Sequence, residues 1–191
     1  MMTSIAIFAS GNGSNARKII DYFRDHDDIA VRLVISNKAD ALVLEAARAE
    51  HIETKIVERS YFYETEQLLT ALRDRNINFI ILAGFLWKVP SYLVRAFERK
   101  IVNIHPALLP NFGGKGMYGS HVHEAVKASG ATQTGITIHY ANENYDEGDI
   151  IFQATCAVLQ SDTAADIARK VLELEHRYFS KTIEDVIRNK K

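Results

Sequence analysis

Short apolar runs alternate with amphipathic segments along most of the chain. Ser4–Ala9 reads as a short buried strand, and Phe79–Ala83 has no polar alternation, which is typical of strands covered by helices on both faces. Further strands are predicted at Ala30–Ser36, Glu53–Val57, Ile101–Ile104, Gln133–Tyr140 and Ile150–Ala157.

Between these runs, apolar residues recur at helical spacing. Ile19, Ile20 and Phe23 mark one side of a helix that follows a glycine turn. Further helices are predicted at Ala41–Glu50, Tyr61–Arg75, Pro90–Phe97, His123–Ala128 and Thr163–Ile187, the last with Ser161 or Asp162 as its N-cap. The alternation predicts an α/β fold with a mostly parallel, twisted sheet and helices on both faces.

Composition narrows the class of protein. A chain of 191 residues, 47% hydrophobic and 25% charged, fits one globular domain over residues 1–191. A formal charge of -1 argues against long nucleic acids as partners. The apolar run Phe79–Trp87 is shorter than the roughly 18 residues that a membrane helix needs. With no secretion signal expected and a single cysteine, Cys156, read as a core residue, we expect a cytoplasmic protein.

The glycine turn Gly11–Asn15 lies between a predicted strand and a predicted helix. Backbone N–H groups at such a helix N-terminus can bind a phosphate. The segment also fits the loose dinucleotide pattern, but the next strand ends in Ser36-Asn37-Lys38 without the acidic residue that would bind a ribose, which disfavours NAD. A tight turn that binds no ligand is the alternative.

Asn103-Ile104-His105-Pro106 carries the strongest candidate chemistry. Strand alternation places Asn103 and His105 on one face, and the proline ends the strand directly after them. Histidine can hold or transfer a proton near neutral pH, and an amide can donate to a developing oxyanion. A hydrogen-bonded histidine with only a structural role is the alternative.

Acidic residues crowd the segment between the last two predicted strands. One interpretation places Asp146 beside His105, where it would favour the imidazolium, and the other is a solvated hairpin. The residue order does not fit a calcium loop, and the His121-x-His123 pair has no suitably spaced third ligand, so no metal site is predicted. The glycine-rich segment Phe112–Gly119 reads as a mobile loop and is a hypothetical lid.

Taken together, these segments resemble the phosphoribosylglycinamide formyltransferases. The resemblance covers nearly the whole chain and rests on five segments, Ser10–Asn15, Ser36–Asp40, Leu82–Phe85, Asn103–Pro110 and Tyr145–Gly148. It implies a Rossmann-like formyltransferase fold and transfer of a formyl group from 10-formyltetrahydrofolate to the amine of glycinamide ribonucleotide in purine biosynthesis, without a metal.

The resemblance also implies roles for individual residues. Asn103 and a protonated His105 would stabilise the oxyanion, and Asp146 would keep His105 charged and help to relay protons. The implied substrate-binding residues are Gly13, Ser14, Asn15 and Glu175, the last of which could also be an ordinary exposed helix carboxylate. The implied folate-binding residues are Leu86, Trp87, Lys88, Val89, Asn103, Asn142 and Asp146.

Three other functions compete with this one. A hydrolase that deformylates the same folate shares the asparagine, histidine and aspartate, but usually carries an additional domain. Formylation of initiator methionyl-tRNA would need an RNA-binding domain and a basic surface. A nucleotide-sensing module could use the glycine turn without catalysis. No membrane partner is expected, and whether the chain forms a homodimer is left open.

Overall fold

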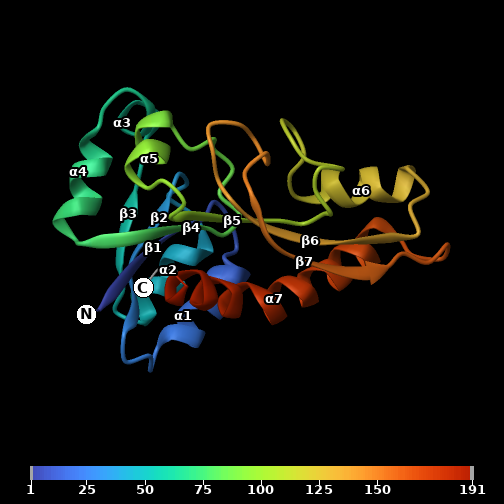
Figure 1. The fold of residues 1–191 in the computed structure, drawn as a ribbon, viewed down its shortest axis with the longest axis horizontal. Coiled ribbons are helices and arrows are strands. Elements are labelled where there is room, and N and C mark those ends of the chain that lie inside the picture. Colours follow the sequence, from blue (N-terminus) through green and yellow to red (C-terminus); the bar gives the residue numbers. More distant parts are fainter. Residues whose placement is uncertain (1, 190–191) are drawn as a thin grey trace. The chain divides into compact units, whose positions relative to one another are not determined.

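A computed structural model describes residues 2–189 (Figure 1). Its strands are β1 (Thr3–Phe8), β2 (Ile29–Ser36), β3 (Glu53–Ile56), β4 (Ile77–Leu82), β5 (Ile101–His105), β6 (Gln133–Tyr140) and β7 (Ile150–Ala157). Its helices are α1 (Ser14–Phe23), α2 (Leu42–Ala49), α3 (Arg59–Tyr63), α4 (Gln67–Asp74), α5 (Ser91–Ala96), α6 (Ser120–Ala128) and α7 (Ala164–Arg188). Each predicted strand is present, with ends within two residues of the prediction.

The strands follow the order β3-β2-β1-β4-β5-β6-β7 in one seven-stranded sheet. β1 pairs in parallel with β2 and β4, β2 pairs in parallel with β3, and β6 and β7 are antiparallel. The predicted α/β class with a mostly parallel sheet is therefore confirmed. The chain divides into two compact units after Val102, and each is described by itself below.

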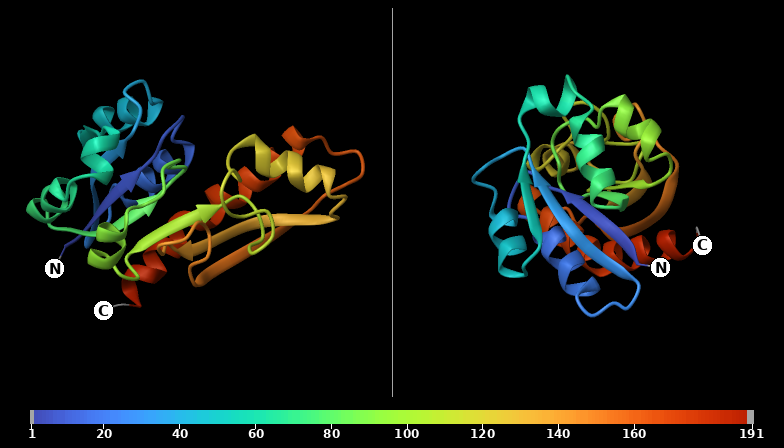
Figure 2. Two further views of the ribbon diagram at one scale, coloured as in Figure 1. Left: turned by 90° about the horizontal axis from the view of Figure 1, so that it is seen from above. Right: turned by 90° about the vertical axis from the view of Figure 1, so that its left-hand side faces the viewer.

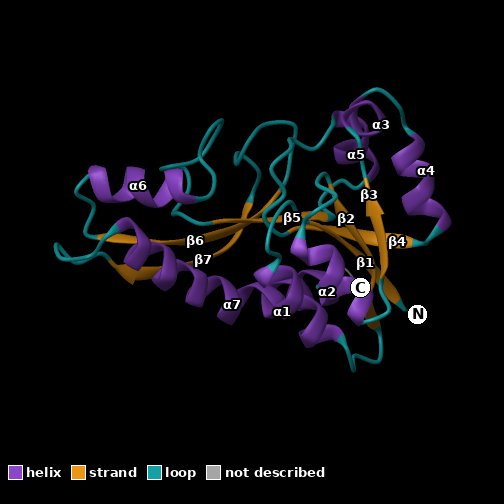
Figure 3. Cartoon of the chain, turned by 180° about the vertical axis from the view of Figure 1, so that it is seen from behind, coloured by secondary structure: helices purple, strands orange, loops and turns teal. Residues whose placement is uncertain are grey.

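In the first unit, helices cover both faces of the sheet. α1 and α2 lie on one face, and α3, α4 and α5 lie on the other (Figures 1 and 3). This explains why β1 and β4 have nearly unbroken apolar sequences, because both sides of each strand face a helix. Ile5, Ile7 and Phe8 are fully buried there.

The predicted single helix over Tyr61–Arg75 is wrong, because the structure has two helices with a break between them. The Thr65 hydroxyl donates to the Tyr61 carbonyl at 3.0 Å and accepts from the Gln67 N–H at 3.4 Å. A threonine side chain that bonds the local backbone competes with the helical pattern. The apolar spacing alone did not reveal this competition.

The second unit contains the end of β5 and everything after it. α7 is amphipathic and packs on β6, β7 and α6, and Figure 2 shows α6 beside the first part of α7. Its N-cap is Thr163, not Ser161 or Asp162 as predicted. Thr163 and Asp166 form a capping box in which each side chain bonds the other's backbone N–H.

Two smaller sequence expectations have different outcomes. Cys156 is half-buried in β7 and is not a core residue, because side chains on both faces of this strand are partly exposed. In residues 2–189, no helix combines the length and the apolar character that a bilayer crossing requires.

Candidate functional site

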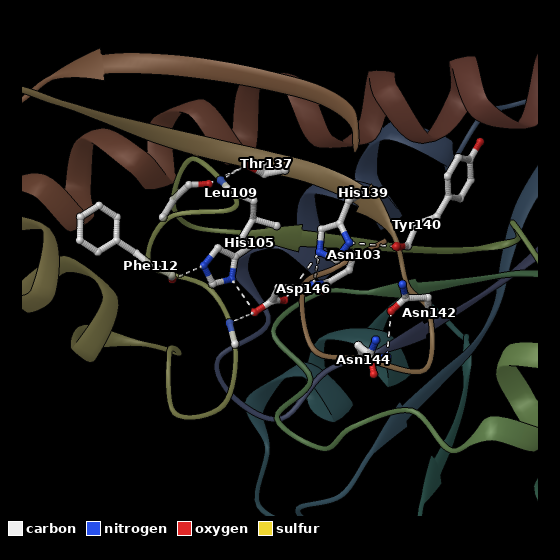
Figure 4. A network of polar contacts seen from close by, with 12 residues as sticks. Asn103, His105, Leu109, Phe112, Thr137, His139, Tyr140, Asn142, Asn144 and Asp146 are labelled. Carbon is white, nitrogen blue, oxygen red and sulfur yellow. Dashed lines mark hydrogen bonds and ion pairs between the residues drawn. The ribbon is translucent and has the colours of Figure 1, made fainter. Parts of the chain in front are cut away.

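Three polar side chains converge at the end of β5. Asn103 and His105 lie two residues apart and therefore on one face of the strand, and Asp146 reaches them from the loop between β6 and β7 (Figure 4). The Nδ1 atom of His105 is 3.5 Å from Oδ2 of Asp146. The predicted meeting of His105 and Asp146 is present, which favours it over the solvated hairpin.

The backbone fixes the position of Asp146. Its φ of 56° lies in the left-handed region, and its Oδ2 accepts a hydrogen bond from the Gly114 N–H at 3.0 Å. Gly113 packs so closely that an added Cβ would lie 2.4 Å from a Leu109 methyl carbon and 3.3 Å from Cβ of Asp146. The start of the glycine-rich loop is thus held against the carboxylate.

Both ring nitrogens of His105 face an acceptor. Nε2 is 2.8 Å from the carbonyl oxygen of Phe112, and Nδ1 faces Asp146. A carbonyl oxygen only accepts, so Nε2 carries a hydrogen. Burial nevertheless lowers the pKa of His105, and this outweighs the effects of Asp146 and the Phe112 carbonyl, which raise it. The two acceptors thus favour the imidazolium, burial favours the neutral ring, and a protonated His105 stays a prediction.

The pKa of Asp146 is shifted in the direction that keeps its charge. Burial opposes the charged form, but the neighbouring His139 and His105 and the Gly114 N–H outweigh burial and lower the pKa of Asp146 below its usual value. The site therefore holds a carboxylate that stays charged beside the imidazole of His105. Such a carboxylate stabilises the imidazole whenever it takes up a proton.

His139 is a member of this cluster that sequence reasoning missed. Its Nε2 lies 3.0 Å from Nδ2 of Asn103 and 3.7 Å from Oδ1 of Asp146 (Figure 4). Its side chain is only 2% exposed. The available signal was strand alternation, which places His139 on the same face of β6 as the polar Thr137, two residues earlier.

Thr137 secures the chain segment that follows His105. Its hydroxyl donates to the Ala107 carbonyl at 2.7 Å and accepts from the Leu109 N–H at 2.9 Å and from Gln153 at 2.8 Å. Gln153 also donates to the Leu109 carbonyl at 3.1 Å. These bonds hold the backbone between His105 and the glycine-rich loop.

The two histidines of α6 have different surroundings. His123 is buried, and burial, followed by the charge of nearby His105, lowers its pKa. His121 is exposed and its ring lies 5.3 Å from that of Tyr118. Across residues 2–189, no group of three His, Cys, Asp or Glu side chains is arranged to hold a metal ion.

Two further predicted residues lie in the second unit. Glu175 is buried in α7, so it is not the exposed helix carboxylate of the alternative interpretation. Asn142 lies in the same loop as Asp146, where its side-chain oxygen accepts from the Asn144 N–H at 2.8 Å.

In the first unit, the predicted phosphate turn has the geometry of a helix start. Gly13 is the N-cap of α1, with φ of 68° and ψ of 32°, and an added Cβ would lie 2.5 Å from the Val43 side chain. Only glycine adopts this positive φ without strain and also has no Cβ to collide with Val43. Ser14 and Asn15 then form the first turn of the helix, whose N-terminal end favours an anion.

Ser10 links this turn to the loops after β2 and β4. Its hydroxyl donates to Oδ1 of Asn37 at 2.6 Å and accepts from the Leu86 N–H at 2.9 Å. The turn and the segment Leu86–Val89 are thus tied together at the carboxyl ends of three parallel strands. Sequence reasoning gave Ser10 no such role.

The segment Leu86–Val89 borders an open hollow of about 530 Å³ within the first unit. Trp87 packs on an aromatic cluster, with ring centroids 5.5 Å from Phe62 and 5.9 Å from Tyr63. The Lys88 carbonyl accepts from the Tyr63 hydroxyl at 3.0 Å. The hollow is lined by Tyr63, Glu64, Thr65, Glu66, Lys88, Val89, Pro90, Ser91, Tyr92 and Arg95.

Comparison with known sequences gives a consistent result. Residues 3–183 match the family described as formyl transferase. The chloroplastic phosphoribosylglycinamide formyltransferase of Arabidopsis thaliana is 41% identical over 187 residues, covering 94% of this chain and 63% of that relative. The Bacillus subtilis (strain 168) phosphoribosylglycinamide formyltransferase is 34% identical, and the match covers 97% of this chain and 95% of that relative. The chain spans 63% and 59% of the length of the Arabidopsis and Vigna unguiculata relatives.

Solved structures agree with the sequence comparison. The phosphoribosylglycinamide formyltransferase from Bacillus halodurans is 32% identical with a TM-score of 0.88, covering 99% of this chain and 97% of that one. The enzyme of the same name from Anaplasma phagocytophilum is 33% identical with a TM-score of 0.87, covering 96% and 86%. All four proteins are similar to this chain over at least 94% of its length.

Proposed function

The chain belongs to the formyl transferase family, and from this premise we propose that it transfers a formyl group from 10-formyltetrahydrofolate to the amine of glycinamide ribonucleotide. The observation that carries the proposal is the cluster of Asn103, His105 and Asp146, with the histidine 3.5 Å from a half-buried carboxylate. This cluster lies within the residues that match the family.

The proposed reaction begins when the substrate amine attacks the formyl carbon. A new C–N bond forms and the carbonyl oxygen becomes negative, stabilised by hydrogen bonds from Asn103 and His105. The bond between the formyl carbon and N10 of the folate then breaks. The proton lost by the amine is carried to N10, so that formylated ribonucleotide and tetrahydrofolate leave.

His105 and Asp146 move this proton in the proposal. A protonated His105 donates to the oxyanion, and the proton of the attacking amine passes to N10 with the help of Asp146, directly or through water. The imidazolium is stabilised by the Asp146 carboxylate, whose lowered pKa keeps it charged. No step requires a metal.

We assign substrate binding to the remaining predicted residues. Gly13, Ser14 and Asn15 bind the ribonucleotide phosphate through the N-terminus of α1, where the helix dipole favours an anion. Glu175 binds the ribonucleotide. The folate is bound by Leu86, Trp87, Lys88 and Val89 in the first unit and by Asn103, Asn142 and Asp146 in the second.

One assay tests the proposed reaction against its rivals. The purified chain is mixed with 10-formyltetrahydrofolate, with and without glycinamide ribonucleotide, and tetrahydrofolate formation is followed. Transfer predicts product only when the ribonucleotide is present. Product formed regardless of the ribonucleotide indicates a deformylating hydrolase, and ribonucleotide binding without product indicates a sensor.

A cytoplasmic location and a single-domain organisation stay predictions. The Arabidopsis relative is chloroplastic, so the location of this chain is tested by fractionation of the source cells. Size-exclusion chromatography with light scattering tests whether the chain forms a homodimer.

A further inference from the structure

We propose that His139 is a positioning residue that fixes the orientation of the Asn103 amide, so that Asn103 presents an N–H to the reacting carbonyl. The inference rests on the proposed transfer reaction, because the orientation of the Asn103 amide matters only if its N–H donates to the reacting carbonyl. His139 itself need not touch a substrate.

The first step is the tautomer of His139. Its Nδ1 lies 2.9 Å from the carbonyl oxygen of Tyr140, which only accepts, so Nδ1 carries a hydrogen. This carbonyl is held in place, since the Tyr140 N–H donates to the Asp149 carbonyl at 2.9 Å. A Cβ added at Gly148 would lie 1.7 Å from the same carbonyl oxygen, so the backbone packs closely around it.

The second step is the orientation of Asn103. In a neutral imidazole with hydrogen on Nδ1, Nε2 has a lone pair and accepts. Its neighbour at 3.0 Å is Nδ2 of Asn103, which donates one of its two hydrogens. A flipped amide would direct its oxygen at this lone pair, so the flip is disfavoured, and the second hydrogen of Nδ2 is left for the substrate.

The third step concerns the charge of Asp146. Its Oδ1 lies 3.7 Å from Nε2 of His139, beyond ordinary hydrogen-bond length, whereas its Oδ2 faces His105. The contact of Nε2 within hydrogen-bond length is therefore with Asn103, and Asp146 is directed toward His105. Burial of His139 excludes water, which in an exposed site could replace Nε2 as the acceptor for Asn103.

Two substitutions separate the contacts of the two ring nitrogens. In His139→Gln the amide oxygen can occupy the position of Nε2 and accept from Asn103. In His139→Asn the shorter amide can keep only a donor near Nδ1, toward the Tyr140 carbonyl. We expect His139→Asn to lower kcat by about 10- to 100-fold, since loss of an oxyanion donor outright costs about 100- to 1000-fold. We expect His139→Gln to turn over several times faster than His139→Asn.

A double-substitution cycle distinguishes positioning from general support of the fold. If His139 acts through Asn103, His139→Asn changes kcat by less than about threefold in an Asn103→Ala background, because coupled residues are not additive. An undiminished loss in that background, or equal activity of the Gln and Asn variants, overturns the proposal. Similar thermal unfolding of the variants excludes a trivial loss of structure.

A spectroscopic measurement tests the inference independently of activity. In chain labelled with ¹⁵N-histidine, the His139 signal is identified by its loss in His139→Gln. Hydrogen on Nδ1 with a bare Nε2 is the expected state, and hydrogen on Nε2 overturns the inference. An inactive chain with the expected tautomer contradicts the proposed function while leaving the tautomer and the amide orientation supported.

Discussion

Nε2 of His105 lies 2.8 Å from the carbonyl oxygen of Phe112, seven residues further along the chain. The backbone of the glycine-rich loop therefore occupies one side of the imidazole while Asp146 occupies the other. Burial favours the neutral ring, and the two acceptors favour the charged ring.

Buried histidines should make stability depend on pH. The pKa values of His105 and His123 are both lowered by burial, so an unfolded chain binds protons that the folded chain does not. Their contribution to stability is complete above the unfolded pKa of about 6.5 and is lost as pH falls below it. Urea unfolding should give a smaller free energy of unfolding at about pH 5.5 than at about pH 7.5.

The control for this pH effect lies in the same helix. His123→Gln should reduce the difference in the free energy of unfolding between the two pH values. Substitution of the exposed His121, in His121→Gln, should leave that difference as in the parent chain. Equal pH dependence in all three proteins would contradict the assignment. Asp146 does not confuse the result, because the stability from its lowered pKa is lost only below the unfolded pKa of about 3.8.

Asp146→Asn should remove the charge and keep the shape. The new amide oxygen can still accept from the Gly114 N–H, and asparagine tolerates the left-handed backbone. We expect kcat to fall by about 100- to 10,000-fold, the usual contribution of a proton-transfer group. Ribonucleotide binding, measured by calorimetry, should remain.

Glu147→Gln is the matched control for Asp146→Asn. Glu147 is exposed in the same loop and accepts from Asn144, a bond that glutamine can keep. It should retain parental kcat. Retained kcat in Asp146→Asn itself would remove Asp146 from the mechanism.

Gly13→Ala should destabilise the turn before α1. The added Cβ meets Val43 at 2.5 Å on a residue with φ of 68°. Left-handed strain and overpacking together should lower the free energy of unfolding by about 2–4 kcal/mol. Gly11→Ala, where nothing lies within 4 Å, should change it by less than about 0.5 kcal/mol. Equal effects would show that the two glycines are equivalent.

Thr137→Val should weaken the segment that follows His105. Valine has the same shape, but it leaves the Leu109 N–H without its acceptor, which costs about 1–3 kcal/mol for a buried group. Thr134 is also buried in β6, and among residues 2–189 its hydroxyl oxygen has no hydrogen-bond partner. Thr134→Val should therefore be neutral or stabilising in thermal unfolding. Comparable losses at both positions would count against the hydroxyl contacts of Thr137.

The sequence predicted best what depends on local periodicity. Strand positions came from apolar runs, and the shared face of Asn103 and His105 followed from alternation. The break in the helix at Thr65 was missed because a single side-chain bond overrides the apolar spacing. The N-cap of α7 was misplaced because neighbouring polar residues compete for one cap, and only Thr163 forms the reciprocal pair.

Features that depend on tertiary contacts could not be predicted in this way. The place of His139 depends on which strand lies beside β5, and nothing within β6 specifies that neighbour. The pKa of His105 depends on burial, which lowers it against the effect of the carboxylate that the sequence did suggest. Both are properties of the surroundings of a residue, not of its own segment.

The left-handed backbone of Asp146 restricts how this loop can be redesigned. At a φ of 56° aspartate and asparagine are accommodated far better than longer acids, so glutamate would add backbone strain as well as length. A graft of the loop onto another scaffold must therefore transplant the torsion angles together with the carboxylate. In a library that varies this position freely, most variants would have a strained backbone. Few of them would show the effect of the side chain's acidity separately from the effect of that strain.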